Sequence, residues 1–585
     1  MNGQNDEAGC PLPSDHSAYA ELHCRPPGPS AEEQRVAAKL MADPEARRRA
    51  LAELRQDERV ESEESDNSQE LYQAIRACVL DKETPAFDKR RRIAALVREE
   101  LVKGGFFCRT SDHRLFYFLR SERQLYDLDQ RPFQHLLASM SGLSATETYF
   151  RFVLDSLQTE TGRGRAVEVY TLAHFDLGTG YLTISDGCGG VWRRERGGAW
   201  EYGCNGDNGL LFFTESEAEP WTPEFRCKDR TLDWFLDRML LSDHGELKQS
   251  DQKTLFLVYL LAQFFPGLRR TRLVPAFLGP QGSGKTSAMR MNGVLFLGNN
   301  FDVTGLHRDR EDAFIAAVSN RVVVALDNAD TRVPWLENAI ATYATGLRYR
   351  LRRLYSTNEE LAFEPRAIMM LSSRDPHFQR PDVAERLLPL RFERPEKYIS
   401  ESVLFQELSS RRGVIWGELL MKLATIADDL GKNESPATPF RMADFASFGW
   451  QVFNQAGKAS EWLTLLKRLE GAQMNFASEG DGLIAALRTL IEREGKVGPL
   501  EVGELFRKSS EIAEVDSLPM SRTVQGFGMK LTNMRRVIEV ELGVKYMEER
   551  RHKGKRFITL IAPGGDTGET GDTISGKVAS SEGTE

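Results

Sequence analysis

Residues 271–286 read TRLVPAFLGPQGSGKT, and this stretch indicates the fold class of the central part of the chain. The apolar run 273–278 predicts a buried strand, and 287–295 can form a helix. Between them, 279–286 fits the phosphate-loop pattern G-x-x-x-x-G-K-[ST] at every fixed position. The sequence therefore predicts a nucleoside-triphosphate site in an α/β domain.

Each residue type in this loop has a physical task. Glycines let the backbone curl so that its N–H groups point at phosphate oxygens. Lys285 is expected to reach the β- and γ-phosphates of ATP, and Thr286 to hold Mg²⁺ through its hydroxyl. The alternative, a glycine-rich turn followed by a chance lysine, leaves the strand and helix around it unexplained. The predicted ATP-binding residues are Gly279, Pro280, Gln281, Gly282, Ser283, Gly284, Lys285 and Thr286.

A second acidic position follows about forty residues later. Residues 321–328 (RVVVALDN) form an apolar strand that ends in Asp327, which would bring a carboxylate beside the loop to coordinate Mg²⁺. The alternative is a buried strand that happens to end in an aspartate. Many ATPases of this type carry a glutamate at the position of Asn328, and an amide cannot accept a proton. The general base therefore stays open, with Asp330 and Glu337 as substitutes.

Another apolar strand, 365–371, ends in two serines. A polar side chain at that strand end could contact the γ-phosphate or the attacking water. We select Ser373 as the catalytic candidate, with Ser372 as the alternative.

The segment 380–386 (RPDVAER) supplies candidates for an arginine finger, which stabilises charge on the transferring phosphoryl group and is often provided by a neighbouring subunit. Arg386 is the first candidate and Arg380 the second. The alternative for each is a local salt bridge with Asp382 or Glu385.

Between these strands, 347–355 reads LRYRLRRLY. The alternation of arginine with apolar or aromatic residues predicts a hairpin with one basic face. Such a face could hold a DNA backbone through Arg348, Arg350 and Arg352. Two alternatives stay open: an exposed basic strand, and arginines that contact a neighbouring subunit's nucleotide.

The order of these motifs resembles a known family. The segments YLLAQFFPGLRRTRLVPAFLGPQGSGKT (259–286) and RPDVAERLLPL (380–390) look like those of superfamily-3 helicases, AAA+-type P-loop ATPases. Within that group the chain is similar to phage- and plasmid-encoded replicative helicases related to poxvirus-type helicase–primases. The resemblance covers about 250–400, is diffuse over 85–225 and is absent from the N-terminal arm.

This resemblance implies an ATP-driven homo-oligomer, typically a hexamer, that translocates on or unwinds DNA. It gives nucleotide roles to Lys285, Thr286 and Asp327, places Ser372 or Ser373 at the sensor position, and makes Arg386 the finger. Two departures put the hydrolysis rate in doubt more than nucleotide binding: the second acid is replaced by Asn328, and the sensor position is more often asparagine.

Composition fits a multi-domain globular chain of 585 residues with 41% hydrophobic and 28% charged residues. The seven cysteines form no C-x-x-C pair, and no apolar run is long enough to cross a membrane. Since MNGQNDEAG lacks the features of a secretory signal, we expect a cytoplasmic protein with reduced thiols. The predicted organisation is a disordered or partly helical arm (1–70), an α+β domain (71–225), a helical lead-in and P-loop ATPase core (226–400), a helical region (401–477), a winged-helix domain (478–562) and a disordered tail (563–585).

The C-terminal prediction rests on three helices (482–493, 502–509 and about 522–535) followed by two strands (537–547 and 556–561). The basic sequence RRHKGK joins the strands and resembles the wing of a winged helix, whose third helix would enter the major groove. A winged helix used for protein contacts is the alternative. The predicted DNA-binding residues here are Arg522, Lys530, Arg535, Arg550, Arg551, Lys553 and Lys555.

These features predict an ATP-dependent helicase or translocase that acts on single-stranded or forked DNA in the replication of a phage, plasmid or integrated element. A slow, ATP-gated DNA-binding initiator or defence scaffold is the first alternative, and Asn328 favours it. A helicase–primase fusion ranks third, because 71–225 contains no paired-carboxylate motif that could hold two metal ions.

Overall fold

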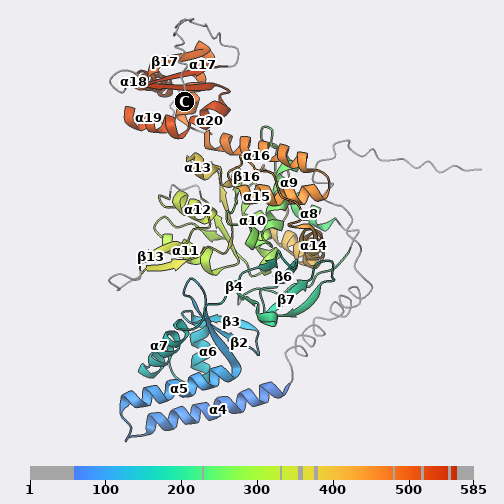
Figure 1. The fold of residues 1–585 in the computed structure, drawn as a ribbon, viewed down its shortest axis with the longest axis vertical. Helices are drawn as coiled ribbons and strands as arrows, with labels where there is room; N and C mark the ends of the chain where they lie inside the picture. The colour runs from blue at the N-terminus through green and yellow to red at the C-terminus, as the bar shows by residue number, and fades with distance from the viewer. Residues whose placement is uncertain are drawn as a thin grey trace, which may run out of the picture. The chain divides into compact units, whose positions relative to one another are not determined.

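The computed structural model describes residues 58–562 except 216, 227–229, 330–332, 353–359, 375–379, 479–480, 516–519 and 551–554, and the side chains of 58–68, 351–362 and 477 are also not described. The predicted tail and most of the N-terminal arm lie outside these residues, as do Asp330, Arg551 and Lys553. The chain divides into two compact units, Met1–Gln473 and Met474–Glu585, which we describe separately (Figure 1).

The first unit begins with helices packed on a three-stranded antiparallel sheet of order β1-β2-β3. Helix α4 starts at Glu58, inside the arm that we expected to be disordered or partly helical. Glutamate, common in its first half, is a good helix former, and Leu71 and Ile75 further along join the buried core. The elements are α4 (Glu58–Leu80), α5 (Ala86–Gly104), β1 (Gly105–Arg109), β2 (Leu115–Leu119), β3 (Gln124–Asp127), α6 (Arg131–Ser141) and α7 (Thr148–Gly162).

A four-stranded antiparallel sheet of order β5-β6-β7-β8 follows. Two short strands, β4 and β5, stand close together in the chain because the backbone changes partner between them: β4 pairs with β9 and β5 pairs with β6. The elements are β4 (Val169–Tyr170), β5 (Ala173–Asp176), β6 (Tyr181–Ser185), β7 (Gly190–Arg194), β8 (Glu201–Cys204), η1 (Asp207–Gly209) and β9 (Leu211–Phe212).

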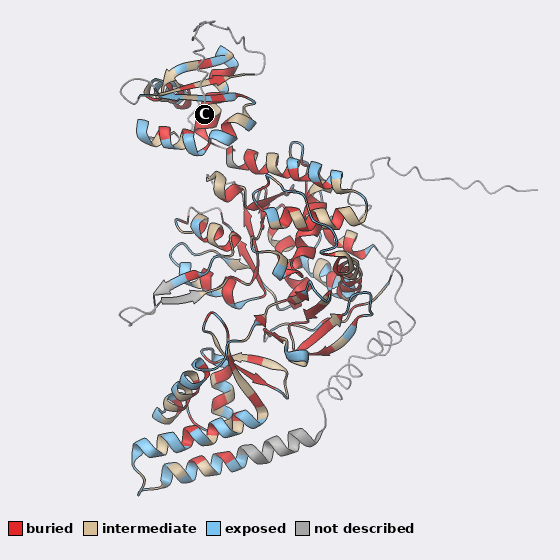
Figure 2. Ribbon diagram, in the orientation of Figure 1, coloured by how far each residue is buried: buried red, intermediate tan, exposed pale blue. Residues whose placement is uncertain are grey.

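The centre of the unit is a five-stranded parallel sheet of order β11-β12-β15-β10-β16. Its residues are mostly buried (Figure 2). Side chains such as Phe277 and Met370 join a core cluster with the helices α9, α10 and α14. The elements up to α13 are α8 (Thr231–Asp237), α9 (Gln249–Ala262), η2 (Pro266–Leu268), β10 (Val274–Leu278), α10 (Lys285–Leu297), β11 (Thr304–Gly305), α11 (Glu311–Asn320), β12 (Val323–Asp327), α12 (Leu336–Ala344), β13 (Tyr349–Arg352), β14 (Glu360–Phe363), β15 (Ile368–Ser373) and α13 (Pro381–Ala384).

The strand order positions the site. Strand β15 lies between β10 and β12, and Leu278 pairs with Ser373 while Leu326 pairs with Leu371. Because parallel strands end at the same edge of a sheet, the loop after β10, the serines of β15 and Asp327 of β12 meet there.

Helix α14 ties α10 to the rest of the unit. The Arg412 guanidinium donates to the carbonyls of Leu295 and Phe296 at the end of α10, and Trp416 Nε1 donates to the carbonyl of Leu295. The Trp416 ring also stacks on Trp221, with centroids 3.7 Å apart and planes 2° from parallel. The remaining elements of this region are β16 (Leu387–Arg391), α14 (Glu401–Asp429), α15 (Ala443–Gln455) and α16 (Ala459–Ser478).

The second unit combines helices with a three-stranded antiparallel sheet of order β17-β19-β18. The predicted strand over 537–547 was wrong at its start, where α20 forms instead. Its β-branched residues favoured a strand, but Val537 and Ile538 are buried one turn after buried Met534, which is helical spacing. Strand β17 was not predicted. The elements are α17 (Gly482–Glu494), β17 (Lys496–Glu501), α18 (Val502–Val515), α19 (Val524–Asn533), α20 (Arg535–Glu541), β18 (Lys545–Arg550) and β19 (Arg556–Ile561).

Candidate functional site

The glycine-rich loop 279–286 connects β10 to α10, and its glycines are required by the backbone. Gly279, Gly282 and Gly284 have φ of 150°, 78° and 83°, where L residues are strained. A Cβ on Gly279 would also lie 2.3 Å from the carbonyl oxygen of Phe392. The loop therefore has a backbone path that other residues would disrupt.

Lys285 is the first residue of α10, and only 8% of it is exposed. Its Nζ donates to the carbonyl oxygens of Gly279 (2.6 Å) and Pro280 (2.8 Å). The ammonium group thus lies over the concave side of the loop, at the start of a helix whose N-terminus favours anions.

Three side chains form a hydrogen-bonded chain across the strand ends. The Thr286 hydroxyl donates to Asp327 Oδ2 over 2.9 Å, and the Ser372 hydroxyl donates to Asp327 Oδ1. Ser373, our first choice, lies one residue further, and its backbone carbonyl accepts from the Gly279 N–H at 3.3 Å. Of the two serines, Ser372 therefore has the more direct contact with Asp327.

Asn328 directly follows β12. Its φ is 58°, a left-handed conformation that asparagine tolerates better than most residues. Its backbone N–H donates to Asp327 Oδ1 (3.0 Å) and Ser372 Oγ (3.2 Å). The residue sits beside the loop, but its amide side chain still cannot act as a general base.

A cavity of about 500 Å³ lies over these residues. Sequence reasoning missed two of its lining residues, Ser287 and Arg374, of which Arg374 directly follows the two serines. The available signal was an arginine directly after a strand that ends beside the phosphate loop. The lining residues are Gln281, Gly282, Ser283, Gly284, Lys285, Thr286, Ser287, Asp327, Asn328 and Arg374.

This donor set fits a magnesium nucleotide. Backbone N–H groups, Lys285 and Arg374 can receive phosphate oxygens. The adjacent Thr286 hydroxyl and Asp327 carboxylate are the hard oxygen ligands that Mg²⁺ prefers. Glu337, considered as a base, does not line the cavity; its carboxylate instead accepts from the Arg380 backbone N–H at 3.4 Å.

Both finger candidates are paired within the chain. The Arg386 side chain is 9% exposed and donates to the Asp382 carbonyl and carboxylate at 2.6 and 3.1 Å. Arg380 is 43% exposed and makes two bonds to the Asp382 carboxylate, at 3.0 and 2.9 Å. The local salt bridge that we considered as an alternative is thus present for both. Burial, followed by the charge of Arg441, lowers the pKa of Arg386, whereas the hydrogen bonds to Asp382 raise the pKa of Arg380.

The predicted basic hairpin is present as the antiparallel pair β13 and β14, with its tip outside the described residues. Tyr349 is buried and donates to the Ala339 carbonyl, whereas Arg350 is exposed. Arg348 lies at the base of the hairpin, 3.7 Å from Glu364, and the side chain of Arg352 is among those not described.

Comparison with known proteins gives one family. Residues 240–464 match the model of a family described as actinomycete integrative conjugative element replication protein, AICE_RepA. The match includes the glycine-rich loop, Asp327 and the hairpin, but fewer than half of the 585 residues. This segment is therefore similar to replication proteins, while the resemblance to superfamily-3 helicases stays a prediction.

No curated protein sequence matches the chain significantly. Among solved structures, the chain is similar to an apo structure of the C-terminal region of NrS-1, with 12% identity and a TM-score of 0.34 over 80% of this chain and 98% of that one. JCV helicase bound to a small acetamide compound matches with 14% identity and a TM-score of 0.19, over 43% of this chain and 66% of that one. Both identities are below 15% and both TM-scores below 0.5.

The C-terminal unit lies beyond the matched segment, and several of its predicted DNA-binding cations are paired. Lys530 contacts the Asp481 carboxylate at 2.6 Å, and Lys555 contacts Glu501 at 2.8 Å. Asp481 is buried and also caps α17 through the Leu483 N–H. The structural role of Lys530 was not visible from the sequence.

Other cations of this unit face solvent. Arg535 pairs with Glu539 at 3.2 Å and lies over the Tyr546 ring. Arg522 and Arg550 are exposed. These two arginines are therefore the best placed of the described candidates for contact with phosphates.

Among the described residues, no group of three or more histidine, cysteine, aspartate or glutamate side chains could hold a metal ion. None of the described helices combines the length and apolarity that a membrane span requires.

Proposed function

We propose that this chain is a DNA-dependent ATPase, an ATP-dependent helicase or translocase that acts in the replication of an integrated or other mobile element. The observation that carries the proposal is the meeting of the glycine-rich loop, Asp327 and Arg374 around one cavity, where Asp327 accepts hydrogen bonds from Thr286 and Ser372. The match to a family of replication proteins over 240–464 supports the biological setting.

In this proposal the loop N–H groups and Lys285 bind the β- and γ-phosphates of ATP, and Arg374 approaches the γ-phosphate from the strand side. Thr286 and Asp327 would hold Mg²⁺, which neutralises phosphate charge when bound. Ser372 keeps the Asp327 carboxylate turned toward Thr286, because its hydroxyl occupies the other carboxylate oxygen. These groups bind and orient the phosphates but include no base for the attacking water.

A second candidate function is a slow, ATP-gated DNA-binding switch. Asn328 favours it, since its side chain can orient water but cannot take its proton, and its backbone is committed to Asp327 and Ser372. Stimulation of turnover by single-stranded DNA would favour the motor over the switch.

The proposed motor is a homo-oligomer, in the simplest form a hexamer, with a finger arginine from a neighbouring subunit. Arg380 suits that role better than Arg386, because much more of its side chain is exposed. DNA would contact the hairpin through Arg350 and the C-terminal unit, which we interpret as a winged helix, through Arg522 and Arg550.

The test is ATP hydrolysis by the full chain with and without single-stranded DNA. Lys285→Ala should reduce turnover to background while leaving DNA affinity within about threefold of the wild type, because Lys285 is remote in sequence from the proposed DNA contacts. Arg290→Ala, one turn further along α10 and outside the cavity lining, is a matched control that should keep turnover. Undiminished hydrolysis by Lys285→Ala would refute the nucleotide assignment.

A further inference from the structure

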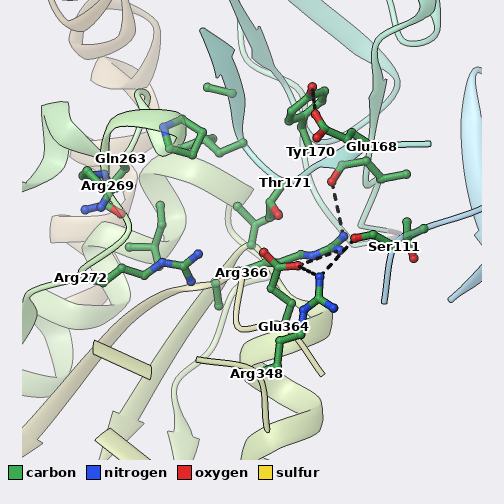
Figure 3. A pocket seen from close by; sticks show the side chains of 18 of the residues that line it. Ser111, Glu168, Tyr170, Thr171, Gln263, Arg269, Arg272, Arg348, Glu364 and Arg366 are labelled. Atoms are coloured by element: carbon green, nitrogen blue, oxygen red, sulfur yellow. Dashed lines mark hydrogen bonds and ion pairs between the residues drawn. The ribbon is translucent and has the colours of Figure 1, made fainter. Parts of the chain in front are cut away.

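A second cavity of about 420 Å³ lies in the first unit, and its lining shares no residue with that of the cavity over the glycine-rich loop. Its lining comes from the β1–β2 turn, the segment around β4, the connection between α9 and β10, and the residues flanking β13 and β14. Figure 3 shows four arginines that line it: Arg269, Arg272, Arg348 and Arg366.

Among the described residues, no carboxylate lies in salt-bridge range of two of these arginines. The Arg269 Nε has no hydrogen-bond partner among these residues and is shielded from solvent. Arg272 donates to the Pro365 carbonyl and lies over the Tyr343 ring, with no carboxylate of the described residues in salt-bridge range. Burial, and next the charge of Arg272, lowers the pKa of Arg269 to about 10. An anion bound between the two guanidinium groups would offset both the burial of the Arg269 charge and its repulsion by Arg272.

The other two arginines are already paired. Arg366 contacts the buried carboxylate of Asp112 at 3.2 Å, and Arg348 lies 3.7 Å from Glu364. Glu168, the remaining acid in the lining, accepts a 2.7 Å bond from the Tyr170 hydroxyl. With four arginines and two glutamates, the lining carries a formal excess of two positive charges.

We propose that this cavity binds a phosphate-bearing ligand of nucleotide size, a phosphate monoester or its anhydride, held by Arg269 and Arg272. Guanidinium groups match phosphate geometry and bind it with paired hydrogen bonds. The volume falls in the range of small-molecule sites. Apolar lining residues such as Val167 and Ile368 leave room for a non-phosphate part, which suits a nucleotide better than inorganic phosphate.

The site has a direct connection to the hairpin. Arg348 precedes β13 and Glu364 follows β14, and both line the cavity. Arg348 also donates to Ser111 Oγ at 3.3 Å, on the β1–β2 turn. A bound anion would draw Arg348 away from Glu364 or Ser111, so ligand binding in the cavity would change the contacts at the base of the hairpin.

The test counts binding sites for radiolabelled inorganic pyrophosphate by equilibrium dialysis of the full chain. Wild type should bind two per chain, Lys285→Ala one, Arg269→Gln one, and the double variant none. Arg270→Gln, an exposed neighbour with the same change of charge, should keep two. Loss of one guanidinium should weaken binding to the cavity by about ten- to a hundredfold. Arg269→Lys, which keeps the charge, should bind between wild type and Arg269→Gln, which a misfolded variant would not do.

Arg269→Gln that still binds two pyrophosphates would overturn the proposal, as would a wild type that binds only one and loses it in Lys285→Ala. If Lys285→Ala keeps two sites and Arg269→Gln loses one, the cavity stands and the nucleotide assignment of the glycine-rich loop fails. Displacement of pyrophosphate from Lys285→Ala by ADP would identify a free nucleotide as the ligand. Displacement only by an oligonucleotide with a 5′-phosphate, and not by its 5′-hydroxyl form, would identify a DNA end. No displacement by either would overturn the assignment to a ligand of nucleotide size.

Discussion

Replacing Ser372 with alanine tests how the carboxylate at the end of β12 is held. The Ser372 hydroxyl donates to Asp327 Oδ1 and accepts from the Asn328 N–H at 3.2 Å, and the residue is 1% exposed. A hydrogen bond to a charged group contributes about 1.5–3 kcal/mol. If that energy orients Asp327 for catalysis, its loss should lower the kcat of ATP hydrolysis by about ten- to a hundredfold.

The assay is steady-state hydrolysis with Mg²⁺ varied, alongside nucleotide binding and thermal unfolding of the same preparations. Ser372→Ala should need more Mg²⁺ for half-maximal turnover, because an unrestrained Asp327 no longer stays beside Thr286. Nucleotide affinity without Mg²⁺ should change less, since the loop N–H groups and Lys285 are untouched.

Ser373→Ala is the matched control. It is equally buried and on the same strand, but its bond to the loop comes from its backbone carbonyl, which the substitution keeps. We expect its kcat to stay within about threefold of the wild type. The reasoning is refuted if Ser373→Ala is the slower variant, or if Ser372→Ala keeps both its kcat and its Mg²⁺ requirement.

Three further predictions concern the arginines, the C-terminal unit and the thiols. Arg380→Ala should fold normally, lose ATP turnover and regain part of it when mixed with Lys285→Ala subunits; no added activity in that mixture would argue against a finger in trans. Arg386→Ala should lower the Tm, because it removes a buried guanidinium that bonds the Asp382 carbonyl and carboxylate. Arg550→Ala should weaken DNA binding, measured by fluorescence anisotropy, without changing the Tm. Lys530→Ala should lower the Tm, because it leaves the buried Asp481 carboxylate without its ion-pair partner. The reverse pattern would contradict the contacts described for Lys530 in α19. Burial raises the pKa of the Cys108 thiol to about 12, so at pH 8 the thiol should stay protonated and resist iodoacetamide until the chain is denatured. Peptide mass spectrometry measures the labelling, and fast labelling of the native protein would show that this packing is wrong.

Much of the parallel sheet could be predicted because its strands are continuous apolar runs that end in recognisable polar residues. The strand before the loop, the strand ending in Asp327 and the strand ending in Ser372–Ser373 were all expected close to where β10, β12 and β15 lie. Local sequence contains that information, since a strand buried on both faces needs apolar residues at nearly every position.

Contacts between distant segments could not be predicted in the same way. The sequence marked Lys530 as a DNA-binding cation, but its partner Asp481 is 49 positions earlier and becomes adjacent only on folding. The local salt bridges of RPDVAER were expected as an alternative, but the pattern did not show that Arg386 is buried while Arg380 is exposed. Helix α20 was missed because valine and isoleucine favour strands locally, and tertiary packing overrode that preference.

The anchoring of α10 by α14 has a mechanical consequence. A helix fixed only at one end can respond to a displacement at the other end by tilting. Helix α10 begins in the glycine-rich loop, and the carbonyls at its other end accept hydrogen bonds from Arg412 and Trp416, so it is fixed there. Arg412 also donates to the carbonyls of Glu219 and Pro220, so the same side chain holds the segment before Trp221, whose ring stacks on Trp416. In the proposed motor, a displacement at the phosphate site would therefore pass along α10 and reach α14 with little loss to tilting.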